Sequence, residues 1–145
     1  MAMTGGKALF IDTNILIFAT DVDSPFHDSA IAALTAAAKG YEELFVSCQV
    51  LREYLASGTR NAVERLEEMA LNIDEFRKSY TVLDDDSACL ERLVSLSRSV
   101  RFGGKQVHDA NIVACMMENG ISSLLTHNIQ DFKRFEGMID LIAMG

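Results

Sequence analysis

Short apolar runs alternate with longer helical segments along most of this 145-residue chain. The runs predict strands at Lys7–Ile11, Leu44–Val46, Thr81–Leu83, Ser123–Thr126 and Ile139–Ile142. Continuously apolar strands that are separated by helices are typical of a parallel sheet covered on both faces. We therefore predict an α/β fold of three layers, in which a five-stranded parallel sheet lies between two layers of helices.

Helix boundaries follow from capping residues and from glycines at the helix ends. Ser24 and Pro25 predict the N-cap and the first position of a helix that runs to Lys39 and stops at Gly40. Ser47 predicts the cap of another helix, which runs to Gly58. The remaining helices are predicted at Thr13–Thr20, at Asn61–Ser79 as one amphipathic helix or two short ones, at Ser87–Phe102 before Gly103 and Gly104, at Gln106–Asn119 before Gly120, and as a short turn around Asp131.

Length and composition predict one domain over residues 1–145. Hydrophobic residues make up 49% of the chain and charged residues 23%, which is too hydrophobic for a disordered protein. No stretch approaches the roughly 20 uninterrupted apolar residues of a membrane span, and Met1–Lys7 lacks the apolar core of a signal peptide. We therefore expect a cytoplasmic protein that does not associate with a membrane.

The formal net charge of −8 argues against a domain that binds nucleic acid passively, because nonspecific phosphate binding relies on Lys and Arg. A nucleic-acid enzyme of this charge needs another explanation. If several carboxylates gather to hold divalent cations, part of the negative charge belongs to the site itself. A bound cation then reverses the local sign of the charge.

Four acidic residues follow predicted strands or begin predicted helices: Asp12, Glu53, Asp109 and Asp131. Each has an ordinary explanation by itself, as a helix cap, a solvated helix residue, a partner of the helix dipole or a turn residue. No single explanation of this kind accounts for all four. Sites in parallel sheets lie outside the carboxyl ends of the strands, where Asp12 and Thr126 are expected. Converging there, the four carboxylates would hold Mg²⁺ or Mn²⁺ through oxygen ligands.

Four segments, in this order and across nearly the whole chain, resemble the motifs of the PIN-domain family, particularly bacterial VapC-type toxins. They are FIDTNIL, VSCQVLREYLAS, VHDANIVACMMENG and LLTHNIQDF. The resemblance assigns the family's acidic positions to Asp12, Glu53, Asp109 and Asp131, with Thr13 and Asn14 beside the first and Asn128 as a polar helper. It also implies a five-stranded parallel sheet. The likeness is weakest at Thr59–Ser79, and His108 and His127 do not belong to the family pattern.

The resemblance implies a metal-dependent endoribonuclease that cleaves single-stranded RNA with Mg²⁺ or Mn²⁺. In that reading Asp12 and Asp109 are the principal ligands, Glu53 binds directly or through water, and Asp131 completes the cluster. The resemblance also implies a toxin that pairs with a cognate antitoxin protein and forms a homodimer. Basic residues near the acids could contact the RNA backbone, and these are Arg98, Arg101, Lys105, Lys133 and Arg134.

Two other functions remain open. An aspartate-nucleophile phosphatase or phosphotransferase would place its Asp after the first strand as well, but it would want a second acid where Asn14 stands. A catalytically silent PIN-like domain that binds a partner protein or RNA without cutting is the second alternative, and only a measurement of activity can exclude it.

Other clusters of reactive residues have simpler interpretations. Asp84, Asp85 and Asp86 are interpreted as caps of the following helix rather than as a metal site. The cysteines, Cys48, Cys89 and Cys115, are odd in number and far apart, so we expect reduced and mostly buried thiols. Zinc binding by His27, His108 and His127 is disfavoured because the three lack the paired local spacing of zinc ligands.

Overall fold

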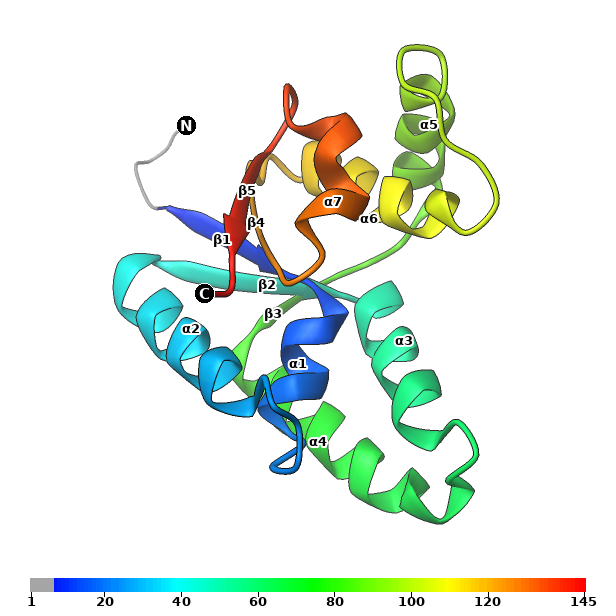
Figure 1. Ribbon diagram of the computed structural model, residues 1–145. Helices are drawn as coiled ribbons and strands as arrows, with labels where there is room; N and C mark the ends of the chain where they lie inside the picture. The colour runs from blue at the N-terminus through cyan, green and yellow to red at the C-terminus, as the bar shows by residue number, and fades with distance from the viewer. Residues whose placement is uncertain (1–6) are drawn as a thin grey trace.

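In the computed structural model, which describes residues 7–145, five parallel strands form one sheet in the order β3-β2-β1-β4-β5 (Figure 1). The strands are β1 (Ala8–Ile11), β2 (Glu43–Ser47), β3 (Thr81–Leu83), β4 (Ser123–Thr126) and β5 (Asp140–Ala143). The predicted fold class and all five predicted strands are confirmed. The last strand begins and ends one residue later than predicted.

The most apolar strand lies at the centre of the sheet. β1 pairs with β2 on one side and with β4 on the other, and Phe10 lies opposite Phe45 and Leu124. Leu9, Phe10 and Ile11 are almost completely buried. A strand with neighbours on both edges and helices on both faces has no solvated side, so its side chains are apolar throughout. The carboxyl end of β1 therefore leads directly to the middle of one sheet edge, where Asp12 lies.

Helices cover both faces of the sheet. Figure 1 shows α1 to α4 on one side and α5 to α7 on the other, an arrangement consistent with the packing of α1 against α2 and α3 and of α5 against α6. The α-helices are α1 (Thr13–Ala19), α2 (His27–Gly40), α3 (Cys48–Thr59), α4 (Leu66–Ser79), α5 (Ser87–Leu96), α6 (Gln106–Glu118) and α7 (Ile129–Phe132), and two 3₁₀ helices lie at Val63–Arg65 and Lys133–Phe135.

Several predicted helix caps are confirmed. The Ser47 hydroxyl accepts a hydrogen bond from the Val50 amide at 3.2 Å at the start of α3. Asp86 accepts one from the Cys89 amide at 3.1 Å at the start of α5. Gly120 takes a φ of 70° after α6, a left-handed conformation that favours glycine. Local side-chain chemistry thus sets these boundaries as the sequence suggests.

Two predicted helix boundaries are wrong. α2 begins at His27 and not at Pro25, because the Ser24 hydroxyl accepts from the Phe26 amide and the Ser24 carbonyl accepts from the His27 amide, which closes a tight turn. α5 ends at Leu96 rather than continuing to Phe102. There the Ser97 hydroxyl donates to the Val94 carbonyl at 2.6 Å. Serine side chains that bond nearby backbone groups compete with helix continuation.

The segment Asn61–Ser79 is divided in two, as one of its predicted forms allows. A 3₁₀ helix at Val63–Arg65 precedes α4, and Asn61 before them has a φ of 57°.

Over residues 7–145, none of the helices combines the length and the apolar character that crossing a membrane requires. The predicted lack of a signal-peptide core at Met1–Lys7 concerns residues that, apart from Lys7, lie outside the described part of the chain.

Candidate active site

Asp12 lies at the carboxyl end of β1 and is the N-cap of α1. One carboxylate oxygen accepts a hydrogen bond from the Thr13 amide at 2.8 Å, and the other accepts one from the Thr126 hydroxyl at 2.7 Å. Thr126 can reach it because β4 is the parallel neighbour of β1. Only 7% of Asp12 is exposed. Two donors therefore orient a carboxylate that has little contact with water.

Glu53 lies on α3, and its side chain turns toward Asp12. Its Oε1 accepts a hydrogen bond from the Thr13 hydroxyl at 3.0 Å. Thr13 thus contacts two acids at once, Asp12 through its amide and Glu53 through its hydroxyl. Because Thr13 begins α1, this residue links the end of β1 to the facing side of α3.

Gln49, one helical turn before Glu53 on α3, was not among the predicted site residues. It is 6% exposed, and its amide nitrogen donates to Glu53 Oε2 at 3.3 Å and to the His108 carbonyl at 2.8 Å. Its carbonyl oxygen accepts from the Asn111 side chain at 2.7 Å. Gln49 therefore joins α3 to the start of α6 and holds Glu53. The glutamine four residues before an acid on one helix was the sequence signal that could have indicated it.

Asp109 lies in the first turn of α6, as predicted, and is half-buried. Its pKa is raised to about 7, chiefly by burial and then by the charges of Asp12, Asp131 and Glu53, while Arg134 lowers it. Burial likewise raises the pKa of Asp12 to about 6; its hydrogen bonds with Thr126 and Thr13 oppose the rise, and the charges of Glu53 and Asp131 add to it. The structure thus brings the four acids close enough to repel one another.

The other residues predicted to support the site occupy the turn between β4 and α7 and the start of α1. Thr126 is fully buried, and its hydroxyl accepts from the Asn128 amide at 3.0 Å while donating to Asp12. The Asn14 side chain accepts from the His127 amide at 3.3 Å. The Asp131 carboxylate is exposed, and its amide donates to the Asn128 carbonyl. Asn128 contributes through its backbone, which fixes the turn that carries Asp131.

The histidines beside these segments have structural contacts. The His127 ring packs against Phe18 and Phe26, with centroid distances of 5.2 and 4.4 Å. His27 contacts the Phe18 carbonyl through Nδ1 at 2.9 Å. His108 is exposed, and its carbonyl is the acceptor for Gln49. Within residues 7–145 the three histidines do not gather into a metal-binding group.

Positive charge near the four acids is sparse. Across the described residues, no Lys, Arg or His nitrogen lies within 4.0 Å of their carboxylate oxygens. Arg134 is near enough to lower the pKa of Asp109, and its guanidinium donates to the Arg101 carbonyl at 3.2 Å. Asp12 is buried and Asp109 is half-buried, and ionising both beside the other two acids is costly unless a proton or a bound cation offsets the charge. The donor set therefore fits a hard cation with oxygen ligands.

The four acids are more widely spaced than the ligands of a preformed site for one ion. In the described part of the chain, the group of three possible ligands whose atoms lie within 4.8 Å of one another is Asp85, Cys89 and Cys115. That group lies on the loop before α5, on α5 and on α6. A cation held by Asp12, Glu53, Asp109 and Asp131 would therefore draw the side chains inward or bind some of them through water, as Mg²⁺ commonly does.

Comparisons of the sequence with known proteins converge on one family. The PIN domain family model matches residues 9–138. Ribonuclease VapC24 of Mycobacterium tuberculosis is 31% identical over 132 residues, which cover 88% of this chain and 90% of that protein. Ribonuclease VapC48 of the same species is 28% identical over 133 residues, which cover 88% of this chain and 91% of that protein.

Solved structures of similar fold point the same way. VapBC-1 from nontypeable Haemophilus influenzae superposes with a TM-score of 0.71 at 17% identity, covering 94% of this chain and 98% of that chain. VapBC2 from Rickettsia felis, bound to a DNA fragment from its promoter, has a TM-score of 0.70 at 22% identity with the same coverage of 94% and 98%. At such identities the likeness concerns the fold.

Proposed function

This chain belongs to the PIN domain family, and from that premise we propose that it is an endoribonuclease that requires a divalent cation, Mg²⁺ or Mn²⁺. The proposed ligands are Asp12, Glu53, Asp109 and Asp131. The relatives named ribonucleases share nearly the full length of the chain, which supports the activity on RNA. Single-stranded RNA is the proposed substrate, and residues 1–145 are proposed to act as one nuclease domain.

One observation supports the proposal most directly: Asp12 is buried, Asp109 is half-buried, and neither forms an ion pair with a basic side chain in the described part of the chain. The pKa of Asp12 is raised to about 6 and that of Asp109 to about 7, chiefly by burial and then, for Asp109, by the charge of Asp12. A folded protein retains such mutual repulsion at a cost in stability. Active sites are the usual places where a chain tolerates it, because the acids are needed for binding or catalysis.

The chain's own residues position the ligands. Thr13 and Thr126 hold the Asp12 carboxylate, and Thr13 with Gln49 holds Glu53. Asp12 and Asp109 are proposed as the principal ligands, Glu53 as a direct or water-bridged ligand, and Asp131 as the most exposed member. When bound, the cation supplies a Lewis acid for the phosphate and lowers the pKa of a water molecule. Arg134, exposed beside Asp109, is proposed to contact the RNA backbone.

A cleavage assay tests the proposal. Purified protein is incubated with a mixed RNA pool plus Mg²⁺ or Mn²⁺, with an EDTA control. We expect cleavage to disappear in EDTA and in the Asp12→Asn and Asp109→Asn variants. Asp74→Asn is the matched control, since it removes the same charge from an exposed position on α4, a helix that carries none of the proposed ligands, and it should cleave like the wild type. Undiminished cleavage by Asp12→Asn would contradict the assignment.

The same assay decides between the enzyme and a silent PIN-like binding domain. A silent domain would retain RNA or a partner protein without producing fragments, with or without Mn²⁺. The aspartate-nucleophile alternative is disfavoured by Asn14, which stands where a second acid is needed and accepts a hydrogen bond from the His127 amide. A phosphoenzyme labelled at Asp12 would support that alternative instead.

We further propose that the chain is the cytoplasmic toxin of a toxin–antitoxin pair and that it forms a homodimer. Support comes from the solved VapBC assemblies of similar fold and from the VapC relatives. A small adjacent upstream reading frame whose product copurifies with this chain and suppresses its cleavage is the expected finding. Light scattering that gives the mass of one chain at micromolar concentration would contradict the homodimer.

A further inference from the structure

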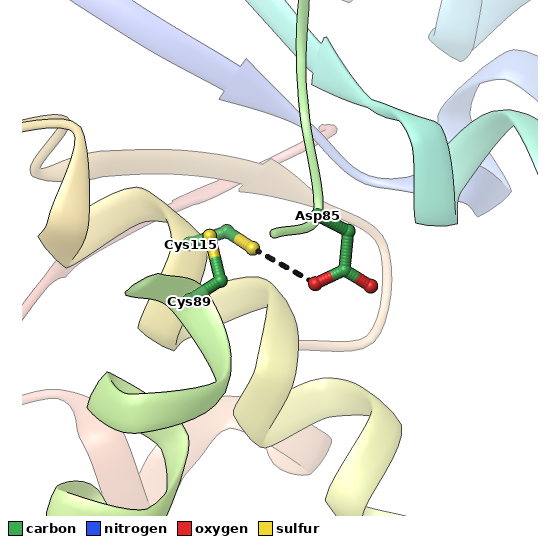
Figure 2. A group of neighbouring side chains, drawn as sticks. All are labelled: Asp85, Cys89 and Cys115. Atoms are coloured by element: carbon green, nitrogen blue, oxygen red, sulfur yellow. Dashed lines mark hydrogen bonds between the residues drawn. The ribbon is translucent and has the colours of Figure 1, made fainter. Parts of the chain in front are cut away.

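Cys89 and Cys115, which are 26 residues apart in the sequence, meet at a buried point beside Asp85. Figure 2 shows the three side chains gathered where the loop before α5 approaches α5 and α6. Cys89 is 1% exposed and Cys115 is fully buried. Sulfur atoms and a carboxylate oxygen of the three residues all lie within 4.8 Å of one another. The sequence spacing did not indicate this group, because Cys115 lies 26 residues beyond Cys89 and on another helix.

Each of the two thiols donates a hydrogen bond to an oxygen atom. Cys115 Sγ donates to Asp85 Oδ1 at 3.6 Å, and Cys89 Sγ donates to the Asp84 carbonyl at 3.6 Å. Each thiol thus contacts an oxygen, Asp85 Oδ1 for Cys115 and the Asp84 carbonyl for Cys89. Tetrahedral zinc sites have bonds of about 2.3 Å to sulfur and about 2.0–2.2 Å to oxygen, so their ligand atoms lie roughly 3.5–3.8 Å apart. A small inward movement of the side chains would bring this group to that spacing.

We propose that Cys89, Cys115 and Asp85 form a second metal site, which takes a thiophilic divalent cation of the zinc class. Soft thiolates select such ions, whereas the carboxylates around Asp12 suit hard ions such as Mg²⁺. The two sites therefore bind different cations from a mixture. The proposal stands on the sulfur-containing group alone and does not depend on the nuclease activity.

Binding replaces protons by the cation. Both S–H bonds break, the two protons pass to solvent, and each sulfur donates a lone pair to the ion, so no electron is transferred. Burial raises the pKa of both thiols, which keeps them protonated while no ion is present. Two thiolates and one carboxylate carry three negative charges, of which a divalent cation balances two. The bound cation thus leaves one net negative charge where the unbound, ionised ligands would carry three.

The Asp85 end of the group faces solvent, while the two sulfurs lie buried behind it. Asp85 lines a groove of about 520 Å³ that also contains Arg52, Gln49 and Asn111. The Asp85 side chain is 25% exposed, and its ion pair with Arg52 is long, at 3.6 Å, with the Arg52 side chain 66% exposed. Exposed pairs of this kind contribute little to stability, so Asp85 can exchange Arg52 for a cation at little cost.

Occupancy would also affect the neighbouring helices. Asn111 donates to Asp85 Oδ1 at 3.2 Å and to Gln49 Oε1 at 2.7 Å, and Gln49 in turn holds Glu53. A cation that takes the Asp85 oxygen removes one acceptor of Asn111. The sulfur site and the carboxylate site are therefore joined by three consecutive hydrogen bonds.

Cadmium is the probe for the test, because bound Cd²⁺ gives an ultraviolet thiolate-to-metal absorption band. Reduced protein under argon is titrated with Cd²⁺ in the presence of excess Mg²⁺. We expect one equivalent to bind and the band to appear. Each of Cys89→Ser and Cys115→Ser should lose at least half of the band, and the double variant should lose all of it. Cys48→Ser, at the start of α3, is the matched control and should keep the full band.

A second measurement does not depend on variants that could fail to fold. ¹¹³Cd NMR of the wild-type protein reports the number of thiolate ligands through the chemical shift. A resonance in the range of mixed sulfur and oxygen ligands supports the site. A resonance in the all-oxygen range alone, a band that survives in the double variant, or a band that is lost in Cys48→Ser would overturn the proposal.

Discussion

Replacing Asp12 with asparagine should stabilise the protein in EDTA above about pH 7 and leave its stability unchanged below about pH 4. The Asp12 carboxyl has a pKa of about 6 in the folded protein against an ordinary value of 3.8. Because the folded state binds this proton more tightly than the unfolded state does, the free energy of unfolding falls as pH rises from about 4 to about 6. Asparagine carries no charge and removes that fall.

The magnitude follows from the difference of about 2 pKa units. Each unit is worth about 1.36 kcal/mol, so charging Asp12 costs about 3 kcal/mol in the folded state. An asparagine side chain at this position can still accept from the Thr13 amide and can donate to the Thr126 hydroxyl, so these two contacts persist in altered form. The expected gain above pH 7 is therefore about 2–3 kcal/mol, or roughly 4–12 °C in melting temperature for a chain of this size.

Urea denaturation in EDTA, carried out at several pH values, measures this gain. The quantity of interest is the difference between Asp12→Asn and the wild type. Asp109 adds to this difference in the same direction, because the charge of Asp12 raises the pKa of Asp109 and asparagine removes that charge. Asp74→Asn serves as the control and should follow the wild-type curve at every pH. An Asp12→Asn protein that is no more stable than the wild type above pH 7, or whose difference does not vary with pH, would refute the reasoning.

Three further outcomes are expected. A hundredfold excess of Mn²⁺ over its Kd should stabilise the wild type by about 2.7 kcal/mol in thermal melts, and an equal response of Asp12→Asn would count against the carboxylate site. Gln49→Ala should lower the free energy of unfolding by about 1–3 kcal/mol and slow RNA cleavage, because the His108 carbonyl and Asn111 lose their partner; unchanged urea midpoints would argue against this role. Phe135→Ala, at a fully buried position, should lower the free energy of unfolding by about 3–5 kcal/mol. A loss below about 1 kcal/mol would show that the neighbouring side chains fill the space left by the ring.

Much of the fold could be predicted because its signals are local. An apolar run such as Leu9 to Ile11 indicates a buried strand without reference to the rest of the chain. Ser47 and Asp86 cap helices through amides only three residues away. The two wrong boundaries are local as well, since Ser24 and Ser97 bond nearby backbone groups in ways that several conformations allow.

The candidate site was only partly visible in the sequence. Positions after strands and at helix starts, together with the family resemblance, indicate Asp12, Glu53, Asp109 and Asp131, and their role as ligands remains a prediction. Gln49 was missed because its partners lie elsewhere in the chain, and Asn111 is 62 residues away. The one local signal for Gln49 is Glu53, one helical turn later on the same helix. That spacing is equally compatible with a glutamine that only contacts solvent.

Residue order by itself determined the alternation of strands and helices, and with it the parallel sheet whose carboxyl edge receives Asp12. Side-chain size, polarity and capping act over a few residues, so they can be interpreted segment by segment. Tertiary structure alone decided which groups meet: Thr126 with Asp12, Gln49 with α6, and Cys89 with Cys115. Such meetings depend on how whole helices pack across the sheet, and the pKa values of the acids follow from that packing because burial and neighbouring charge exist only in the folded chain.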